Sequence, residues 1–407
     1  MKLYEAALNI PEFEEVLRGV SLSKTPFLCV GLSQVHKAHI GAALRNRMGV
    51  KTLVLTPDEP SAVRMFEDIK GFCPDYPVYH FPAGELNLLD TAAASGEYCH
   101  RRLACLEALR IGNPLLVASC EAALQYTISP MALVDASLLL KGSFDKGLEG
   151  LVTALNNAGY KRLDQVEGSC TYAVRGGIVD FFTPSAENPV RVEFWGDDID
   201  SIAFFNEENQ RREGICDEIM ITPASEAVIP TEKLQDFLKG EQDKQKKETP
   251  AFKKLEDMIE NSQNEIYPSS FDRFLPVMYG EAYTLFDHLD ENSILIISDT
   301  VAINQQFNDI FWQFNEDIPE LLEKGICYKG CDRYYADKEY LFKKAEKSRT
   351  VIFEEFARTL PPEISTRGMV NFKAMTQAPW GGELDLLLEE IRPAIHMGES
   401  VAVLLPT

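Results

Sequence analysis

Four apolar segments near the start of the chain, each followed by a helical pattern, place the strongest constraint on its fold. They lie at 26–31, 51–57, 77–81 and 113–119. Their length and their content of branched and aromatic residues are typical of buried strands. Strands that alternate with helices favour a parallel sheet covered on both faces. The sequence therefore predicts a doubly wound α/β domain, which we place at 23–128.

The pattern changes after Pro130. A helix is predicted at 147–158, and strand patterns then dominate to about residue 221, so we place a small α+β domain at 129–224. Two later strand patterns, at 292–299 and 349–356, are expected to extend the parallel sheet. The predicted fold class is thus α/β, with a core of parallel strands and a small α+β domain inserted into it.

The small domain is organised around a strand-rich stretch, residues 171–206, which we interpret as three consecutive strands joined by tight turns. In the middle strand, alternation places three apolar side chains on one face, those of Val190, Val192 and Phe194. The opposite face then carries the side chains of Arg191, Glu193 and Trp195.

Three side chains of this stretch are candidates for binding. Arg175 comes just before Gly176 and Gly177, where a strand can bulge or be approached closely. Because Arg and Trp are the residue types most enriched at binding hot spots, Arg175, Arg191 and Trp195 are the candidate residues. On pattern alone a second interpretation is commoner, in which the indole lies over its own sheet beside an Arg–Glu cross-strand pair and the protein is a structural scaffold.

The chain is strongly acidic, with a formal net charge of −23 over 407 residues. Such a surface repels a phosphate backbone, because affinity for nucleic acid comes largely from Lys and Arg. A protein is therefore the expected partner. Nine scattered cysteines, the lack of a signal peptide and the lack of an apolar run of about 18 residues predict a cytoplasmic protein with free thiols and no membrane partner.

The loop after the first strand is similar to a phosphate-binding loop that has lost its chemistry. Gly31 and Lys37 stand in the register of the G-x-x-x-x-G-K-[ST] motif, between a strand and a helix. His36 replaces the second glycine, and Ala38 replaces the Ser or Thr that holds Mg²⁺. We therefore expect a P-loop fold without P-loop function, in which Gly31 and Lys37 are vestiges that hold at most a stray anion.

No arrangement typical of catalysis or metal binding stands out in the sequence. The best candidate for the acidic strand end of a motor, residues 351–355, lacks an Asp–Glu pair. Cys327 and Cys331 have no second pair that would complete a zinc site. No Ser–His–Asp or two-carboxylate arrangement is evident. We expect no catalytic residue, no metal and no cofactor in this chain.

The segment AVRGGIVDFFTP…NPVRVEFWGDDIDSI resembles the domain 2 signature shared by two families, the excision-repair protein UvrB and the N-terminal part of the bacterial transcription-repair coupling factor (Mfd). In both families this domain docks onto UvrA. The resemblance implies that Arg175, Arg191 and Trp195 contact UvrA, with Trp195 in a position where Phe is usual. The degenerate loop and the lack of a tyrosine-rich hairpin in FPAGELNLLDTAAAS favour the coupling factor over UvrB.

The resemblance also implies a division into domains. Residues 23–128 would form domain 1a, a degenerate, helicase-like P-loop domain with a parallel sheet. Residues 129–224 would form domain 2, the small α+β UvrA-binding domain, and residues 1–22 plus 225–345 domain 1b. Residues 346–369 would be a linker region, and 370–407 the truncated start of a further α/β domain.

As a member of this family, the chain is expected to be a non-catalytic module that recruits UvrA of nucleotide excision repair to stalled RNA polymerase, in transcription-coupled DNA repair. RNA polymerase, DNA, ATP and Mg²⁺ are expected to bind only to domains beyond residue 407, among them an ATP-dependent DNA translocase. The alternative is an ATP-dependent UvrB-type helicase subunit that hydrolyses nucleotide at Lys37 and binds damaged DNA. The losses at His36 and Ala38 argue against that alternative.

Overall fold

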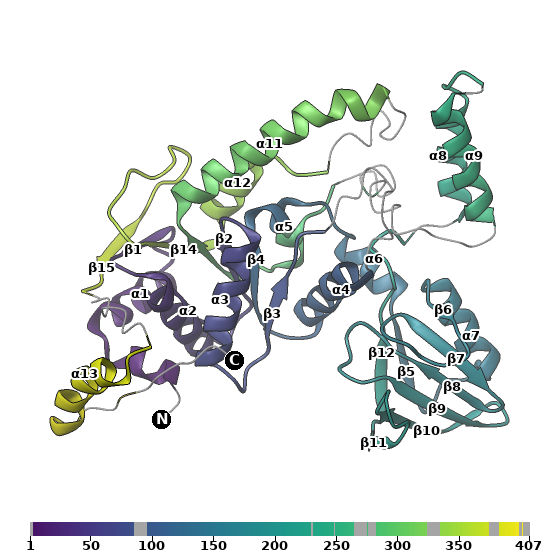
Figure 1. Cartoon of the computed structure of the whole chain (residues 1–407), viewed down its shortest axis with the longest axis horizontal. Coiled ribbons are helices and arrows are strands. Elements are labelled where there is room, and N and C mark those ends of the chain that lie inside the picture. The colour runs from purple at the N-terminus through teal and green to yellow at the C-terminus, as the bar shows by residue number, and fades with distance from the viewer. Residues whose placement is uncertain are drawn as a thin grey trace.

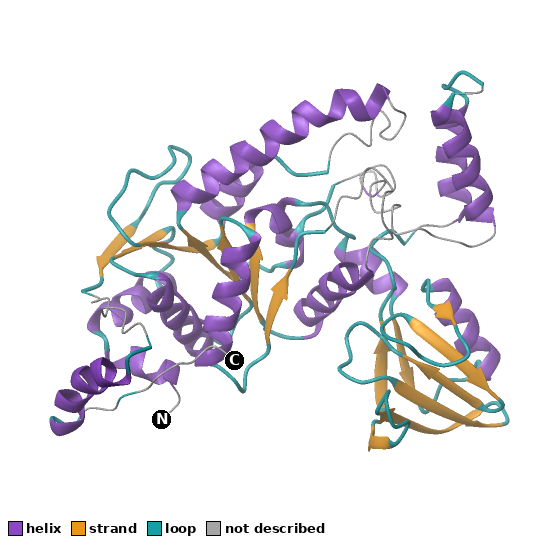
Figure 2. Cartoon of the chain, viewed as in Figure 1, coloured by secondary structure: helices purple, strands orange, loops and turns teal. Residues whose placement is uncertain are grey.

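The computed structural model describes residues 3–84, 96–228, 231–247, 249–263, 275, 282–323, 334–373, 382–398 and 401. A large sheet with helices on its faces occupies one part of the molecule, and a smaller unit of mainly antiparallel strands lies beside it (Figure 1, Figure 2). The predicted mixed α/β class, with a parallel sheet core and additional sheets, is confirmed.

The large sheet has seven parallel strands within the described residues, in the order β15-β1-β14-β13-β2-β4-β3. The strands are β1 (Phe27–Val30), β2 (Thr52–Thr56), β3 (Val78–Phe81), β4 (Leu115–Ser119), β13 (Ile294–Ser298), β14 (Arg349–Glu354) and β15 (Gly368–Asn371). The four strands predicted near the start of the chain and the two predicted later all belong to this sheet. β15 escapes prediction because its four residues hold only two large apolar side chains, Met369 and Val370.

Helices cover both faces of this sheet, because alternate strand residues point to opposite sides. One face packs against η1 (Leu3–Asn9), α1 (Pro11–Ser21), α2 (Gln34–Met48) and α3 (Glu59–Phe72). The other packs against α4 (Gly96–Ile111), α5 (Cys120–Leu124), α6 (Pro130–Ala136), η3 (Leu285–His288), α11 (Thr300–Glu323) and α12 (Lys338–Lys347). In β2, for example, Val54 joins the first cluster, whereas Leu53 and Leu55 join the second. We call the sheet and these helices the parallel-sheet body.

The parallel-sheet body is assembled from two separate parts of the chain. β1 to β4 come from its first part, and β13 to β15 come from its last part, yet β14 and β13 lie between β1 and β2. Residues 346–369, interpreted from the sequence as a linker region, therefore include a strand inside the sheet, where five of its six residues are buried. How the chain divides into domains otherwise remains a prediction.

The smaller unit spans residues 138–221, and we call it the antiparallel unit. Within the described residues it has a six-stranded sheet of order β11-β10-β9-β8-β7-β6 and a two-stranded sheet of β12 and β5. Its elements are β5 (Leu138–Lys141), α7 (Gly147–Asn157), β6 (Lys161–Arg162), β7 (Thr171–Arg175), β8 (Ile178–Phe181), β9 (Val190–Trp195), β10 (Asp198–Phe205), β11 (Arg212–Ile215) and β12 (Glu218–Ile221). α7 and both sheets share one apolar core, to which Leu151, Leu155 and Tyr172 contribute.

The stretch 171–206 holds four strands, so the prediction of three is wrong. β7 and β8 pair antiparallel across Gly176 and Gly177, and Gly176 has a φ of +60°. A glycine pair accommodates the left-handed backbone of a tight hairpin turn, so the chain reverses direction here and does not bulge within one strand.

Three further helices of the described residues lie outside these two parts. Charged helical patterns at 231–265 predict a pair of surface helices, and α8 (Thr231–Gln242) and α9 (Pro250–Gln263) confirm it; they pack on each other through Leu234, Leu238, Leu255 and Met258. The amphipathic pattern at 381–398 predicts a helix, which α13 (Leu384–His396) confirms. The strand that the sequence predicts after it lies outside the described residues except for Val401. No described helix combines the length and apolar character that crossing a membrane requires.

Candidate protein-interaction site

The candidate residues of β9 lie on the outward face of the antiparallel unit. Val190 and Val192 are fully buried, and Phe194 packs against the same core. The alternate residues of the strand therefore point away from the core, as the pattern of the sequence predicts. These are Arg191, Glu193 and Trp195.

Strand register brings more residues to this outward face. Arg191 pairs with Asp180 of β8 on one side and with Ala203 of β10 on the other, and Ala203 pairs with Ile215 of β11. Directly opposite residues of antiparallel strands share a face, so these four side chains form a row across the sheet. The hairpin between β7 and β8 returns Arg175 to the same face, beside Asp180.

A buried carboxylate orients both candidate arginines. The side chain of Asp180 is only 1% exposed. Its Oδ1 accepts a hydrogen bond from Nε of Arg191 at 2.7 Å, and its Oδ2 accepts from Nη2 of Arg191 at 2.9 Å. The same Oδ2 accepts from Nη2 of Arg175 at 2.8 Å. A bidentate pair fixes the plane of a guanidinium, so the Arg191 side chain is held in one orientation.

Arg191 is held from a second side as well. Its guanidinium carbon lies 4.6 Å from the centre of the Phe205 ring, and its Nη2 donates to Oε1 of Gln210 at 3.2 Å. The hydrogen bonds to Asp180 raise the pKa of Arg191, against the smaller effect of burial. The Arg191 side chain is 20% exposed and that of Arg175 is 50% exposed, so Arg175 presents more of its surface to a partner.

Trp195 ends β9 and projects into solvent. It is 84% exposed, pairs with Asp198 across the hairpin, and is followed by Gly196 at a φ of +65°. The second interpretation of the sequence placed the indole over its own sheet. The structure does not show that arrangement, because the indole projects into solvent. Trp carries a large apolar surface, and its exposure at a strand end is typical of a contact site for another molecule.

A second ion pair flanks Trp195 on the same face. Oε2 of Glu193 lies 2.9 Å from Nη2 of Arg212 and also accepts a hydrogen bond from Oγ of Ser201 at 2.9 Å. These hydrogen bonds, from Ser201 first and from Arg212, lower the pKa of Glu193. The outward face thus carries three arginines, two of them paired with Asp180 and one with Glu193, in a chain whose net charge is −23. Asp198, opposite Trp195, adds a third carboxylate to this face.

Sequence reasoning misses two residues of this face, Asp180 and Ile215. Ile215 is 73% exposed, but its short strand carries no alternating pattern. Asp180 is hidden by the interpretation of β7 and β8 as a single strand, which leaves Arg175 and Arg191 without a shared partner. The signal that could have found it is the glycine pair at 176–177, since such a pair between two apolar runs is a hairpin signal.

The loop that begins at Gly31 follows β1 of the parallel-sheet body. Gly31 has a φ of +87°, and a Cβ there would lie 2.2 Å from the carbonyl oxygen of Phe372. The backbone N–H of Leu32 donates to the carbonyl of Glu354 at 3.3 Å. Lys37 is only 6% exposed, and burial lowers its pKa although nearby carboxylates act in the opposite direction. The chain's own backbone thus fills the space beside Gly31.

Within the part of the chain that the structure describes, no group of three or more His, Cys, Asp or Glu side chains is placed to hold a metal ion. The seven cysteines described there are free thiols. Cys327 and Cys331, considered above as a zinc-ligand spacing, lie outside the described residues.

The antiparallel unit matches a known protein family. A family model described as the UvrB interaction domain matches residues 140–226. The matched region contains the outward face with Arg175, Arg191 and Trp195, and it ends at Glu226, just after the unit's last strand.

Relatives that are similar over most of the chain share one description. The transcription-repair-coupling factor of Bacillus subtilis (strain 168) is 24% identical over 397 residues, which cover 93% of this chain and 33% of that protein. The factor of Staphylococcus epidermidis (strain ATCC 12228) is 25% identical over 393 residues, with the same coverage of 93% and 33%. This chain thus spans about a third of the length of the curated relatives it matches. The resemblance expected from the sequence is confirmed: the chain is similar to the N-terminal region of transcription-repair-coupling factors and contains a UvrB interaction domain.

Proposed function

We propose that this chain is a non-catalytic N-terminal module of a transcription-repair coupling factor that recruits UvrA of nucleotide excision repair to stalled RNA polymerase. Similarity to such factors over 93% of the chain, including a UvrB interaction domain, supports this role. UvrA would dock on the outward face of the antiparallel unit. RNA polymerase, DNA and an ATP-dependent motor would belong to other regions of these longer proteins. The free cysteines fit a cytoplasmic location.

One observation carries the proposal: an indole that is 84% exposed lies on the same face as two arginines that a buried carboxylate holds in place. Trp and Arg dominate binding hot spots. Side chains that are already held lose less conformational freedom on binding. Two guanidiniums beside an apolar anchor suit a protein partner that offers carboxylates around an apolar socket.

The proposal is tested by calorimetry of this chain with purified UvrA. Trp195→Ala is the sharpest variant, because a side chain that exposed contributes little to the fold. We expect it to raise the Kd at least tenfold, a loss of about 1.4 kcal/mol. Arg191→Ala is expected to weaken binding at least as much, but it also removes a partner of the buried Asp180.

Trp312→Ala is the matched control, since Trp312 is also an exposed indole, 66% exposed, but lies on α11 of the parallel-sheet body. Its affinity for UvrA should equal that of the native chain. A folded native chain that does not bind UvrA would refute the recruitment role. Equal affinity of the Trp195→Ala variant and the native chain would show that UvrA binds to another surface.

We propose further that residues 31–38 bind no nucleotide, which sets this chain apart from a UvrB-type helicase. His36 and Ala38 lack the chemistry of the motif. The Phe372 carbonyl also lies against Gly31, where a Cβ would come within 2.2 Å of its oxygen. Titration with Mg²⁺ and ATP should therefore give no heat of binding. Saturable binding that Lys37→Ala abolishes would favour the helicase alternative.

A further inference from the structure

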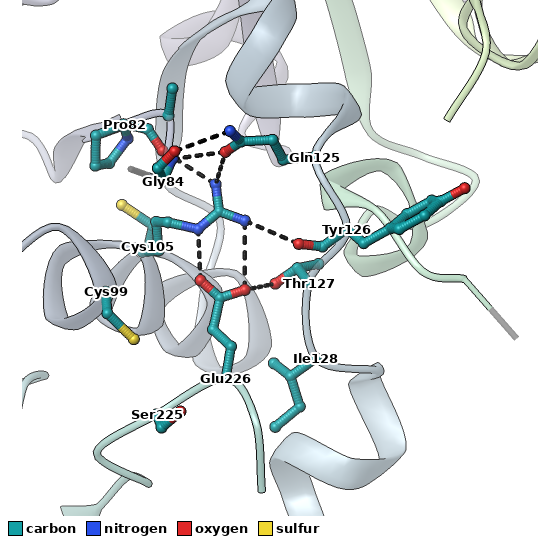
Figure 3. Close-up of polar contacts among 12 residues, drawn as sticks. Pro82, Gly84, Cys99, Cys105, Gln125, Tyr126, Thr127, Ile128, Ser225 and Glu226 are labelled. Atoms are coloured by element: carbon teal, nitrogen blue, oxygen red, sulfur yellow. Dashed lines mark hydrogen bonds and ion pairs between the residues drawn. The ribbon is translucent and has the colours of Figure 1, made fainter. Parts of the chain in front are cut away.

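The chain enters and leaves the antiparallel unit at one place. It enters after α6, at Ser137, and leaves through residues 222–228, after β12; the first and last residues of the unit, Leu138 and Ile221, pair with each other. Figure 3 shows Thr127, which lies between α5 and α6 in the parallel-sheet body, beside the carboxylate of Glu226 in the leaving segment. Oγ1 of Thr127 donates a hydrogen bond to Oε2 of Glu226. The leaving segment is therefore joined directly to the parallel-sheet body.

Arg102 of α4 joins the same leaving segment to further parts of the parallel-sheet body. Its Nε donates to Oε1 of Glu226 at 2.5 Å, and its Nη2 reaches Oε2 at 3.3 Å. The same guanidinium donates to the carbonyl of Pro82 at 3.1 Å, to Oε1 of Gln125 at 3.3 Å and to the carbonyl of Tyr126 at 3.4 Å. One side chain thus contacts the end of β3, the end of α5 and the segment that leaves the unit.

The pair is buried and has little room to move. The Arg102 and Glu226 side chains are 3% and 4% exposed, and the guanidinium carbon lies 4.3 Å from the centre of the Phe81 ring. The leaving segment is also fixed on the side of the antiparallel unit, because the N–H of Ala224 donates to the carbonyl of Ala158 at 2.8 Å. Only one residue, Ser225, lies between Ala224 and Glu226, so the segment is held at both ends of a short span.

We propose that Arg102 and Glu226 are positioning residues that set the orientation of the antiparallel unit on the parallel-sheet body. A buried ion pair adds little net stability, because desolvation of the charges offsets their attraction. A bidentate pair is directional, however, and only one arrangement of the leaving segment on the parallel-sheet body satisfies its hydrogen bonds. The pair thereby fixes where the outward face points relative to the rest of the molecule. This inference does not depend on the identity of the partner.

The test compares the whole chain with a double variant, Arg102→Met with Glu226→Leu. Apolar side chains of similar size keep the contact between residues 222–228 and the parallel-sheet body packed. They leave no buried charge, so the variant is expected to fold. Small-angle scattering should then show a larger radius of gyration and a broader distribution of distances. The amide of Ala224 should exchange with solvent about tenfold faster than in the native chain, because its hydrogen bond to the Ala158 carbonyl opens more often.

Glu226→Gln alone is expected to change scattering and exchange in the same direction. Glu218→Gln is the matched control, because Glu218 pairs with Lys141 at 2.7 Å within the antiparallel unit, where both side chains are about half exposed. It should leave both readouts unchanged. A double variant that folds with native scattering and native exchange would overturn the proposal, since packing alone would then set the orientation. Neither readout requires UvrA, so the result is independent of the proposed recruitment role.

Discussion

At the scale of single residues, Asp180 determines how the outward face is presented. It is nearly inaccessible to solvent, yet it accepts hydrogen bonds from two arginines that are partly exposed. The visible part of the site is thus organised by a residue that no partner can touch. Its effect on binding must act through the arginines that it orients.

Asp180→Asn keeps the shape of this side chain and removes its charge. We expect the free energy of unfolding of the antiparallel unit to fall by about 2 kcal/mol, because Arg191 loses a charge-assisted pair in a poorly hydrated position. Chemical denaturation followed by far-UV circular dichroism measures this loss. Affinity for UvrA should fall as well, since both guanidiniums lose their fixed orientation.

Glu193→Gln is the control for that experiment. Glu193 also pairs with an arginine on the same face, but both side chains of the pair are about one third or more exposed. Such pairs contribute little, so the change should stay within about 0.5 kcal/mol. Equal losses for the two variants would mean that Asp180 has no special part in ordering the face.

At the scale of elements, the turn at Gly176 is what brings Arg175 and Asp180 together. Gly176→Ala places a Cβ on a left-handed backbone, at a φ of +60°, where there is no neighbour within 4 Å to clash with. The expected destabilisation is about 1 kcal/mol and comes from the backbone alone. Gly176→Asn should cost less, because Asn adopts this conformation more readily.

Thermal unfolding of the Gly176 variants is compared with that of Gly142→Ala. Gly142 also lies in a turn of the antiparallel unit and has no neighbour within 4 Å, but it has no left-handed φ. The control substitution should therefore leave the melting temperature unchanged or raise it slightly. A similar loss at both positions would contradict the assignment of strain to the turn.

Asp287 links η3 to α12 and makes that contact dependent on pH. Burial raises its pKa, but the Thr284 N–H, Lys344 and Tyr340 outweigh burial through hydrogen bonds of 2.8–2.9 Å, so its pKa is lowered. The unfolded chain then takes up a proton at higher pH than the folded chain. The stability from this carboxylate is present above the ordinary Asp pKa of about 4 and is lost as the pH falls through the folded value.

Asp287→Asn should consequently lower the free energy of unfolding at pH 7 by about 1 kcal/mol and flatten its decrease below pH 4. Urea denaturation at a series of pH values tests both effects. Glu339→Gln, which removes an exposed partner of Lys343 on the same α12, should preserve the native pH profile. An unchanged acid slope in Asp287→Asn would show that other carboxylates govern the acid range.

At the scale of the whole molecule, local sequence patterns predict the helices and strands, but they do not predict which distant elements come into contact. The strands of the large sheet are recognised because each is a short apolar run with a helix after it. The pair of Arg102 with Glu226 spans 124 residues, and nothing near either residue signals it. The same holds for the approach of Phe372 to Gly31. Which segments meet depends on how the elements stack, and a single sequence carries that information only indirectly.

The order of the large sheet predicts how truncation acts. A chain of residues 1–345 lacks β14, which pairs with both β1 and β13. We expect it to lose the helical signal of the parallel-sheet body and to become sensitive to proteases there, while the antiparallel unit stays resistant. A chain of residues 1–373 keeps the seven strands described for the sheet and should behave as the native chain. Native protease resistance of the shorter chain would show that β14 is dispensable.

The insertion of the antiparallel unit between β4 and β13 has a consequence for the newly made chain. As residues leave the ribosome, β7 to β11 can pair with their immediate neighbours in sequence, and such local pairing is fast. β1 and β2 lack their neighbours β14 and β13 until residues 294–298 and 349–354 have been made, so their backbone hydrogen-bonding groups on those edges stay unpaired until then. Nascent chains of this protein are therefore expected to carry a folded antiparallel unit on an unfinished parallel-sheet body, and chaperones are expected to protect mainly β1 and β2.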